Sequence, residues 1–238
     1  MAAQILKITT CLFVFCQLMA VKAQPLNHEI WDDLLQEHVS PNGQVNYDGF
    51  IQDYEKLTRY ITHLQNVLPD IESREKSEQL AFWINAYNAC TVRLICDHMP
   101  LSSIKDINRP WKKTVLTSDG TTYTLDDIEH DILRKMQEPR IHFAINCASF
   151  SCPQLAQKAY TGLDLESQLD GAAQTFLRDS SKNNLEGDPL ILSKIFFWFK
   201  KDFGTTQELI VLINNYTGLN LPHNTEVIYR SYDWSLNH

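Results

Sequence analysis

The chain of 238 residues has few glycines, 8 in all, and shows no repeat, low-complexity segment or flexible linker. These absences exclude collagen-like and disordered classes, which need a biased or periodic composition. No phosphate-binding glycine loop, Gly-x-Ser-x-Gly elbow or HExxH motif occurs. Basic residues are also outnumbered: 21 Lys and Arg against 29 Asp and Glu give a formal net charge of −8. Because cations that neutralise phosphates supply most nucleic-acid affinity, we expect no nucleic-acid partner.

What the chain does contain is typical of one globular domain. It is 44% hydrophobic and carries 5 Trp, 9 Tyr and 11 Phe, which is enough to build a large core. Single cores stop growing at roughly 250–300 residues. We therefore predict that residues 24–238 form a single domain.

The first 23 residues have the pattern of a secretory signal peptide. Lys7 precedes an apolar stretch, and Val21-Lys22-Ala23 places small residues at the −3 and −1 positions of a cleavage site. The apolar run is shorter than the ~20 residues that span a bilayer. We predict a signal peptide over residues 1–23, a secreted or extracytoplasmic protein, and no integral membrane segment after its removal.

Removing the signal peptide also removes two of the six cysteines. The four that remain are Cys90, Cys96, Cys147 and Cys152. On one helix, Cys90 and Cys96 would be separated by about 9 Å of rise, beyond the ~7 Å limit for a disulfide, so they are predicted to be packed thiols. Cys147 and Cys152, five residues apart across a loop, could form a bridge.

Hydrophobic periodicity predicts a helix-rich α+β domain with a small, mainly antiparallel sheet. Helices are expected twice within residues 29–68, around a turn at 40–43, and over residues 73–98, 125–136, 153–160, 164–178 and 206–215. Strands are expected at residues 114–117 and 121–123, joined by an Asp-Gly turn, and at residues 140–147, 190–192 and 226–232. The strand at 140–147 is expected to be central, because both of its faces are apolar.

The segment after that strand is the best candidate for chemistry. It leads through Cys147 and a short loop to Cys152, which precedes Pro153. Proline is favoured at the first helical position, so Cys152 is predicted to lie at the start of a helix. There the free N–H groups and the helix dipole would lower the pKa of a thiol and could bind an oxyanion. Cys147 is an alternative nucleophile, and a Cys147–Cys152 disulfide in an oxidising compartment is an equally good interpretation.

A thiol enzyme also needs a base. His130 follows Glu129 on one predicted helix, and His142 lies on the strand that leads to Cys147. Alternation along that strand would place His142 and Cys147 on opposite faces. Neighbours on a helix diverge by about 100°, so we do not expect Glu129 to orient His130 directly.

Two amides and a hydroxyl complete the candidate site. Asn85 and Asn88 lie on an otherwise apolar helix, so they must bond to something, either by pinning a loop or by binding a substrate carbonyl. Ser151, in the cysteine loop, is a further candidate for substrate or oxyanion support. We expect no metal site and no cofactor, because the cysteines lack a second ligand pair at zinc spacing.

Five segments resemble the domain-of-unknown-function 547 family: AFWINAYNA (81–89), TLDDIEHDILR (124–134), EPRIHFAINCASFSCPQL (138–155), LSKIFFWFKKDF (192–203) and YDWSLN (232–237). The resemblance covers about residues 46–238, with departures at Asn146, Phe150 and Gln154. It implies a fold related to papain-like cysteine peptidases. It also implies site roles for Cys152 or Cys147 as nucleophile, His130 and His142 as bases, Glu129 as an orienting carboxylate, and Asn85 and Asn88 as polar support.

The resulting expectation is a secreted, papain-like thiol enzyme that cleaves or transfers an amide, peptide or glutathione-like substrate. Its partner would be a small molecule or peptide. The alternative is a non-catalytic binding module with a structural Cys147–Cys152 disulfide, and a third possibility is metal-dependent hydrolysis. The sequence leaves the substrate and the oligomeric state open.

Overall fold

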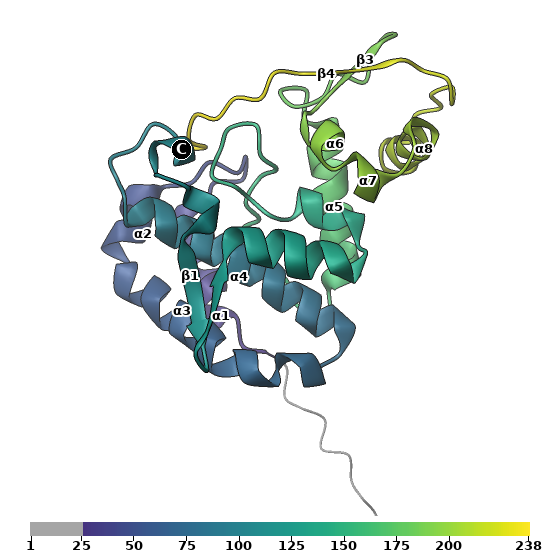
Figure 1. The fold of residues 1–238 in the computed structure, drawn as a ribbon. Coiled ribbons are helices and arrows are strands. Elements are labelled where there is room, and N and C mark those ends of the chain that lie inside the picture. The colour runs from purple at the N-terminus through teal and green to yellow at the C-terminus, as the bar shows by residue number, and fades with distance from the viewer. Residues whose placement is uncertain (1–25) are drawn as a thin grey trace, which may run out of the picture.

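A computed structural model describes residues 26–238 of the chain, and the predicted signal peptide lies outside these residues. Figure 1 shows a helical N-terminal half and, beside it, a smaller C-terminal half with α5 to α8 and the strands β3 and β4. The end of the chain returns across the molecule to the N-terminal half. The fold is α+β and helix-rich, as predicted.

The N-terminal half is built on four helices. They are α1 (Glu29–His38), α2 (Tyr47–Gln52), α3 (Tyr54–Val67) and α4 (Lys76–Cys96), with the 3-10 turn η1 (Leu68–Ser73) before α4. Residues 29–68 therefore contain three α-helices instead of the two expected. The extra break lies at Asp53, which ends α2 and begins α3.

Helix α4 is the centre of the larger core. Every residue from 80 to 92 is buried, which confirms the prediction of a helix that is apolar nearly all round. Cys90 and Cys96 are free and buried on this helix, as their spacing predicted. Burial raises the pKa of both thiols to about 12, so they are protonated and unreactive at neutral pH.

The predicted hairpin is present. Strands β1 (Thr114–Ser118) and β2 (Thr121–Thr124) pair antiparallel, and Asp119 and Gly120 between them have positive φ angles. Two short 3-10 turns precede it, η2 (Ile104–Asp106) and η3 (Pro110–Lys112).

The helical segment after the hairpin forms, but with unusual winding. Thr124 and Asp127 exchange hydrogen bonds at its start. It continues as the π-helix η4 (Asp127–Ile132) and the 3-10 turn η5 (Leu133–Met136) instead of one α-helix. π-Helical turns are rare and frequently mark functional sites, and apolar spacing does not reveal them.

Two predictions in the next segment are wrong. Residues 140–147 do not form a central strand: Pro139 opens the 3-10 turn η6 (Pro139–Phe143), capped by the Glu138 carboxylate, which accepts from the Arg140 N–H. Residues 153–160 do not form a helix, so Cys152 does not lie at a helix start. The backbone of this segment bonds instead to side chains from α4, a tertiary interaction that outweighs local propensity.

The C-terminal half contains the remaining elements. They are α5 (Leu165–Arg178), β3 (Leu190–Leu192), α6 (Ile195–Trp198), α7 (Lys200–Phe203), α8 (Thr206–Thr217) and β4 (Val227–Tyr229). Strands β3 and β4 pair in parallel. The described residues thus hold two separate two-stranded sheets, one antiparallel and one parallel, instead of one mainly antiparallel sheet.

The buried apolar side chains form two clusters. The larger is centred on α4, and the smaller joins Phe143 to α5, β3 and the helices α6 to α8. Phe143, in η6, packs against Phe176 of α5 and Phe196 of α6, so η6 ties the two halves together. Within residues 26–238, none of the helices has the length and apolar character that crossing a membrane requires.

The N-terminus of α8 allows a small stability prediction. Thr205 and Glu208 form a capping box, in which the Thr205 hydroxyl accepts from the Glu208 N–H and the Glu208 carboxylate accepts from the Thr205 N–H. We expect Thr205→Ala to lower the free energy of unfolding by about 1 kcal/mol. Thr206→Ala, one residue inside the helix, is the matched control and should change it far less. Urea denaturation of the three proteins measures the difference.

Candidate active site

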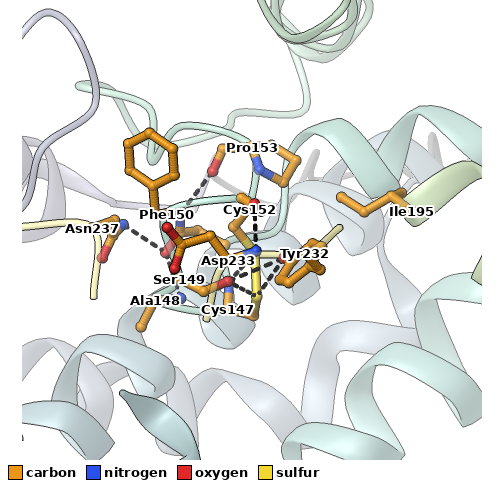
Figure 2. Close-up of a disulfide and its surroundings, with 12 residues drawn as sticks. Cys147, Ala148, Ser149, Phe150, Cys152, Pro153, Ile195, Tyr232, Asp233 and Asn237 are labelled. Carbon is orange, nitrogen blue, oxygen red and sulfur yellow. Dashed lines mark hydrogen bonds between the residues drawn. A yellow bond between two sulfur atoms is a disulfide. The ribbon is translucent and has the colours of Figure 1, made fainter. Parts of the chain in front are cut away.

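The site is built where the cysteine loop meets the end of the chain. The Phe150 N–H donates to the Ser235 carbonyl, and Ser151 exchanges hydrogen bonds with Asp233. Figure 2 shows Tyr232 beside the two sulfur atoms and Asn237 on the other side of the loop. The loop and residues 232–237 therefore form one folded unit.

A cavity of about 280 Å³ opens beside this unit. Its described lining comes from α4, η3, η4, η6, the cysteine loop, α6 and the C-terminal segment. The lining includes all five candidate catalytic residues: Cys147, Cys152, His130, His142 and Glu129. These residues come from separate turns and loops, and the fold brings them to one place.

The two loop cysteines are joined. Cys147 and Cys152 form a disulfide with their Cα atoms 6.1 Å apart. Ala148, inside the ring that the bond closes, has a φ of 60° although it is not glycine, and such backbone conformations are concentrated at functional sites. The structure thus adopts the bridge that the spacing allowed.

The two sulfur atoms differ in their surroundings. Cys147 is half-buried, and its Sγ lies 3.1 Å from the Ser149 hydroxyl and 3.3 Å from the Tyr232 hydroxyl. Cys152 is buried, and its Sγ accepts the Cys147 N–H at 2.8 Å. Both sulfurs therefore have hydrogen-bond donors that could stabilise a thiolate, but Cys147 is the more accessible of the two.

Glu129 is a buried carboxyl group in the cavity wall. Its Oε2 accepts a hydrogen bond from the Tyr87 hydroxyl of α4 at 3.2 Å. Burial raises its pKa to about 7, although the hydrogen bond from Tyr87 and the charge of Arg134 oppose the shift. Glu129 is thus partly protonated near neutral pH, which suits a proton donor or acceptor.

His142 is held in one orientation. Its Nε2 lies 2.7 Å from Oδ2 of Asp202 in α7, and its ring stacks on Phe199 with the centroids 3.9 Å apart. Burial lowers the pKa of His142, and the Asp202 carboxylate opposes this shift. Because the nitrogen that faces a carboxylate carries the proton, Nδ1 of the neutral ring is left as a potential acceptor.

Asp202 is shared between His142 and Arg134. The Arg134 guanidinium donates two hydrogen bonds to it, at 2.6 and 2.8 Å. Burial would raise the pKa of Asp202, but the hydrogen bonds from Arg134 and His142 outweigh burial and hold that pKa well below its usual range. Asp202 is therefore an ionised orienting group.

His130 has a different partner. Its Nδ1 lies 3.2 Å from Nη1 of Arg134. Its neighbour Glu129 bonds instead to the Tyr87 hydroxyl. This agrees with the expectation that Glu129 does not orient His130 directly.

Asn85, Asn88 and Ser151 are not among the residues that line this cavity. Asn85 donates to the Tyr160 carbonyl and accepts from the Tyr160 N–H. Asn88 makes the same pair of bonds, to the Ala144 carbonyl and the Asn146 N–H. The amides of both asparagines are thus occupied in holding the loop. The Ser151 hydroxyl accepts from the Asp233 N–H.

Several lining residues were not singled out from the sequence. They are Tyr87, Trp111, Asp126, Trp198, Phe199, Tyr232 and Trp234. All of them except Trp111 lie in segments quoted for the family resemblance. The signal was therefore present, but no residue chemistry distinguished these aromatic residues from core residues.

One group of possible metal ligands lies away from this cavity. A nitrogen of His38 and carboxylate oxygens of Glu37 and Asp53 lie within 4.8 Å of one another. The Lys56 ammonium, 2.8 Å from Asp53 and 3.7 Å from Glu37, already balances these carboxylates. The group is therefore accounted for as an ion-pair network.

Comparison with protein families gives one match. Residues 71–177 match the family described as "Protein of unknown function, DUF547". This region contains three of the five resembling segments, and the segments at 192–203 and 232–237 lie outside it. Searches of curated proteins and of solved structures found no match.

Proposed function

We propose that this protein is a thiol-dependent enzyme that cleaves or transfers an amide or peptide group, with Cys147 as its nucleophile. The observation that carries the proposal is the convergence of two cysteines, two histidines and a carboxyl group on one cavity. Buried titratable groups with shifted pKa values beside potential nucleophiles are typical of catalytic sites.

The Cys147–Cys152 disulfide makes reduction the first step. A thiol reductant supplies two electrons and two protons, becomes a disulfide itself, and leaves two cysteine thiols. Cys147 is the better nucleophile because its sulfur is the more accessible and has two hydroxyl groups within 3.3 Å. Cys152, next to it, can re-form the disulfide by exchange with a disulfide compound, which is reduced to two thiols, and thus protect the nucleophile in an oxidising compartment.

The catalytic step follows from the same groups. The Cys147 thiolate attacks the carbonyl carbon of the substrate, a C–S bond forms, and the C–N bond breaks. His142, oriented by Asp202, accepts the thiol proton at Nδ1. His142 then donates this proton to the departing amine. Water or another amine then releases the acyl group.

The proposal includes secretion and an origin in the papain-like fold. The disulfide supports an oxidising compartment, and the pattern of residues 1–23 supports export. The papain-like relationship rests on the resembling segments alone, three of which lie in the matched region.

Alkylation with iodoacetamide at mildly acidic pH tests the nucleophile. The protein is treated with or without a phosphine reductant, and the labelled residue is located by mass spectrometry. We expect labelling of Cys147 only after reduction, at least about tenfold faster than that of Cys90 or Cys96, because burial keeps these two protonated.

Two serine variants extend this test to activity on a set of amide and peptide substrates. Cys147→Ser should abolish turnover, whereas Cys152→Ser should be active without added reductant. Cys90→Ser is the matched control and should behave like the wild type. If the reduced wild type shows no turnover and Cys147 labels no faster than Cys90, the enzyme proposal is wrong.

The disulfide itself favours a second candidate, a non-catalytic binding module in which the bridge is structural. In that case the bridge should resist the reductant until the protein unfolds. Both serine variants would then lose stability but keep any ligand binding. Intact-mass analysis of the alkylated native protein separates the two candidates.

A further inference from the structure

The charges that line the cavity are of one sign. Its described lining contains the carboxyl groups of Asp126 and Glu129 and the two histidines, but no lysine or arginine. Glu129 is 8% exposed, so its charge is poorly screened by water when it ionises. The cavity is therefore electrostatically suited to a cation and unsuited to an anion.

The walls of the cavity add a second feature that favours a cation. Trp198, Tyr232 and Trp234 form a continuous aromatic wall, with ring centroids 4.7 Å apart for Trp198 and Tyr232 and 4.5 Å apart for Tyr232 and Trp234. Trp111 extends this wall at 5.6 Å from Trp234. The faces of aromatic rings carry negative electrostatic potential and attract ammonium groups, tryptophan most strongly.

The same wall already attracts one cation. The Lys105 ammonium lies 3.9 Å from the centroid of the Trp234 ring. The other nearby cation, Arg134, is held by two hydrogen bonds to Asp202. The carboxyl group of Glu129, by contrast, has a neutral partner in the Tyr87 hydroxyl. The charge of Arg134 also acts on Glu129, but among the described residues no salt bridge joins Glu129 to a cation, so a ligand could supply one.

We infer that the cavity binds the ammonium group of a substrate between Glu129 and the aromatic wall. This inference deepens the proposed function and rests on it, because it takes the bound cation to be part of the enzyme's substrate. It selects among the possible substrate classes. Amides and peptides fit if they carry a free amine or a quaternary ammonium and have no net negative charge. Glutathione-like compounds, which have an ammonium group but a net negative charge, do not fit.

Binding of a cation should depend on pH. The groups that face Glu129 are Tyr87, Asp126, Arg134, Asp202 and Tyr232. Glu129 attracts a cation only when it has lost its proton, so the affinity should rise as the pH passes through about 7. Protonation of His142 at lower pH would repel the ligand and acts in the same direction.

Three small probes of nearly the same shape test the inference on the oxidised protein, where no thiol chemistry can occur. They are choline, its neutral isostere 3,3-dimethylbutan-1-ol, and the anion 3,3-dimethylbutanoate. Tryptophan fluorescence and calorimetry measure binding. We expect choline to bind at least about tenfold more tightly than the neutral isostere at about pH 8, and the anion to bind most weakly.

Substitutions assign the binding to this cavity. Glu129→Gln should weaken choline binding about tenfold and remove most of its rise with pH, with little effect on the neutral isostere. Asp131→Asn, which removes an exposed carboxylate from the same π-helix, is the matched control and should change nothing. Trp198→Leu, at a position that is 41% exposed, should weaken choline binding more than binding of the isostere.

Equal affinity for choline and its isostere, tighter binding of the anion, or no binding of any probe would overturn the inference. Because the oxidised protein is used, these results do not depend on the thiol. Choline selectivity without reductant-dependent turnover would contradict the enzyme proposal but support the cation site. Turnover without cation selectivity would support the enzyme proposal but contradict the cation site.

Discussion

We expect Glu129→Gln to raise the free energy of unfolding by about 3 kcal/mol at about pH 8, although the residue lies in the proposed catalytic cavity. Glu129 has a pKa of about 7 in the folded protein, against an ordinary value of 4.5, because of its burial. At about pH 8 the wild type must therefore hold an ionised carboxylate in a poorly hydrated site. Glutamine has nearly the same shape, can still accept the Tyr87 hydroxyl, and carries no charge.

The sign of the pH dependence follows from the raised pKa. Between 4.5 and about 7 the folded wild type binds a proton at Glu129 that the unfolded chain has lost, so its stability falls as the pH rises through this window. The gain from Glu129→Gln should thus be small at about pH 4, grow across the window and level off above about pH 7.

Urea denaturation at several pH values measures this effect. Asp131→Asn is again the matched control, because it removes an exposed carboxylate from the same helix and should change the stability by less than about 1 kcal/mol at every pH. A loss of stability in Glu129→Gln at about pH 8 would contradict the assignment of Glu129 as a destabilising buried acid.

The second large effect is expected at Asn88, where Asn88→Ala should lower the free energy of unfolding by about 4 kcal/mol. The Asn88 side chain is 2% exposed and bonds to the Ala144 carbonyl and the Asn146 N–H. Without it, both backbone groups stay buried and unpaired, at about 1–3 kcal/mol each, and a cavity is left behind.

Asn214 provides a matched control for this substitution. It makes the same pair of bonds, to the carbonyl and N–H groups of Leu221, but it is half-buried on α8. Water can replace its amide, so Asn214→Ala should cost only about 1 kcal/mol. If both substitutions lower the free energy of unfolding by similar amounts, burial does not set the cost of removing such a pair of hydrogen bonds.

The sequence predicts most helices and the hairpin because their signals are local. The apolar run of α4 and the Asp-Gly turn each depend on neighbours in the chain. The segment 140–160 could not be predicted in this way. Its backbone partners are Asn85 and Asn88, more than fifty residues earlier, so a pattern that resembled a strand and a helix is overridden by tertiary hydrogen bonds.

In the candidate site, too, the residue types could be predicted from the sequence, but their tertiary contacts could not. Cys147, Cys152, Glu129, His130 and His142 could be named from residue chemistry, and all five line one cavity. Whether the cysteines are bridged depends on loop geometry that spacing alone left open. Tyr232 and Trp234 could not be placed, because they reach the cavity from a segment 85 residues beyond Cys147.

This late segment has a consequence for the order in which the protein matures. Residues 147–152 leave the ribosome well before residues 232–237, which hold the loop through the Ser235 carbonyl and Asp233. The nascent chain thus carries its two loop cysteines without their Tyr232 wall. In the nascent chain, the cysteine loop therefore lacks these contacts until the C-terminal segment docks.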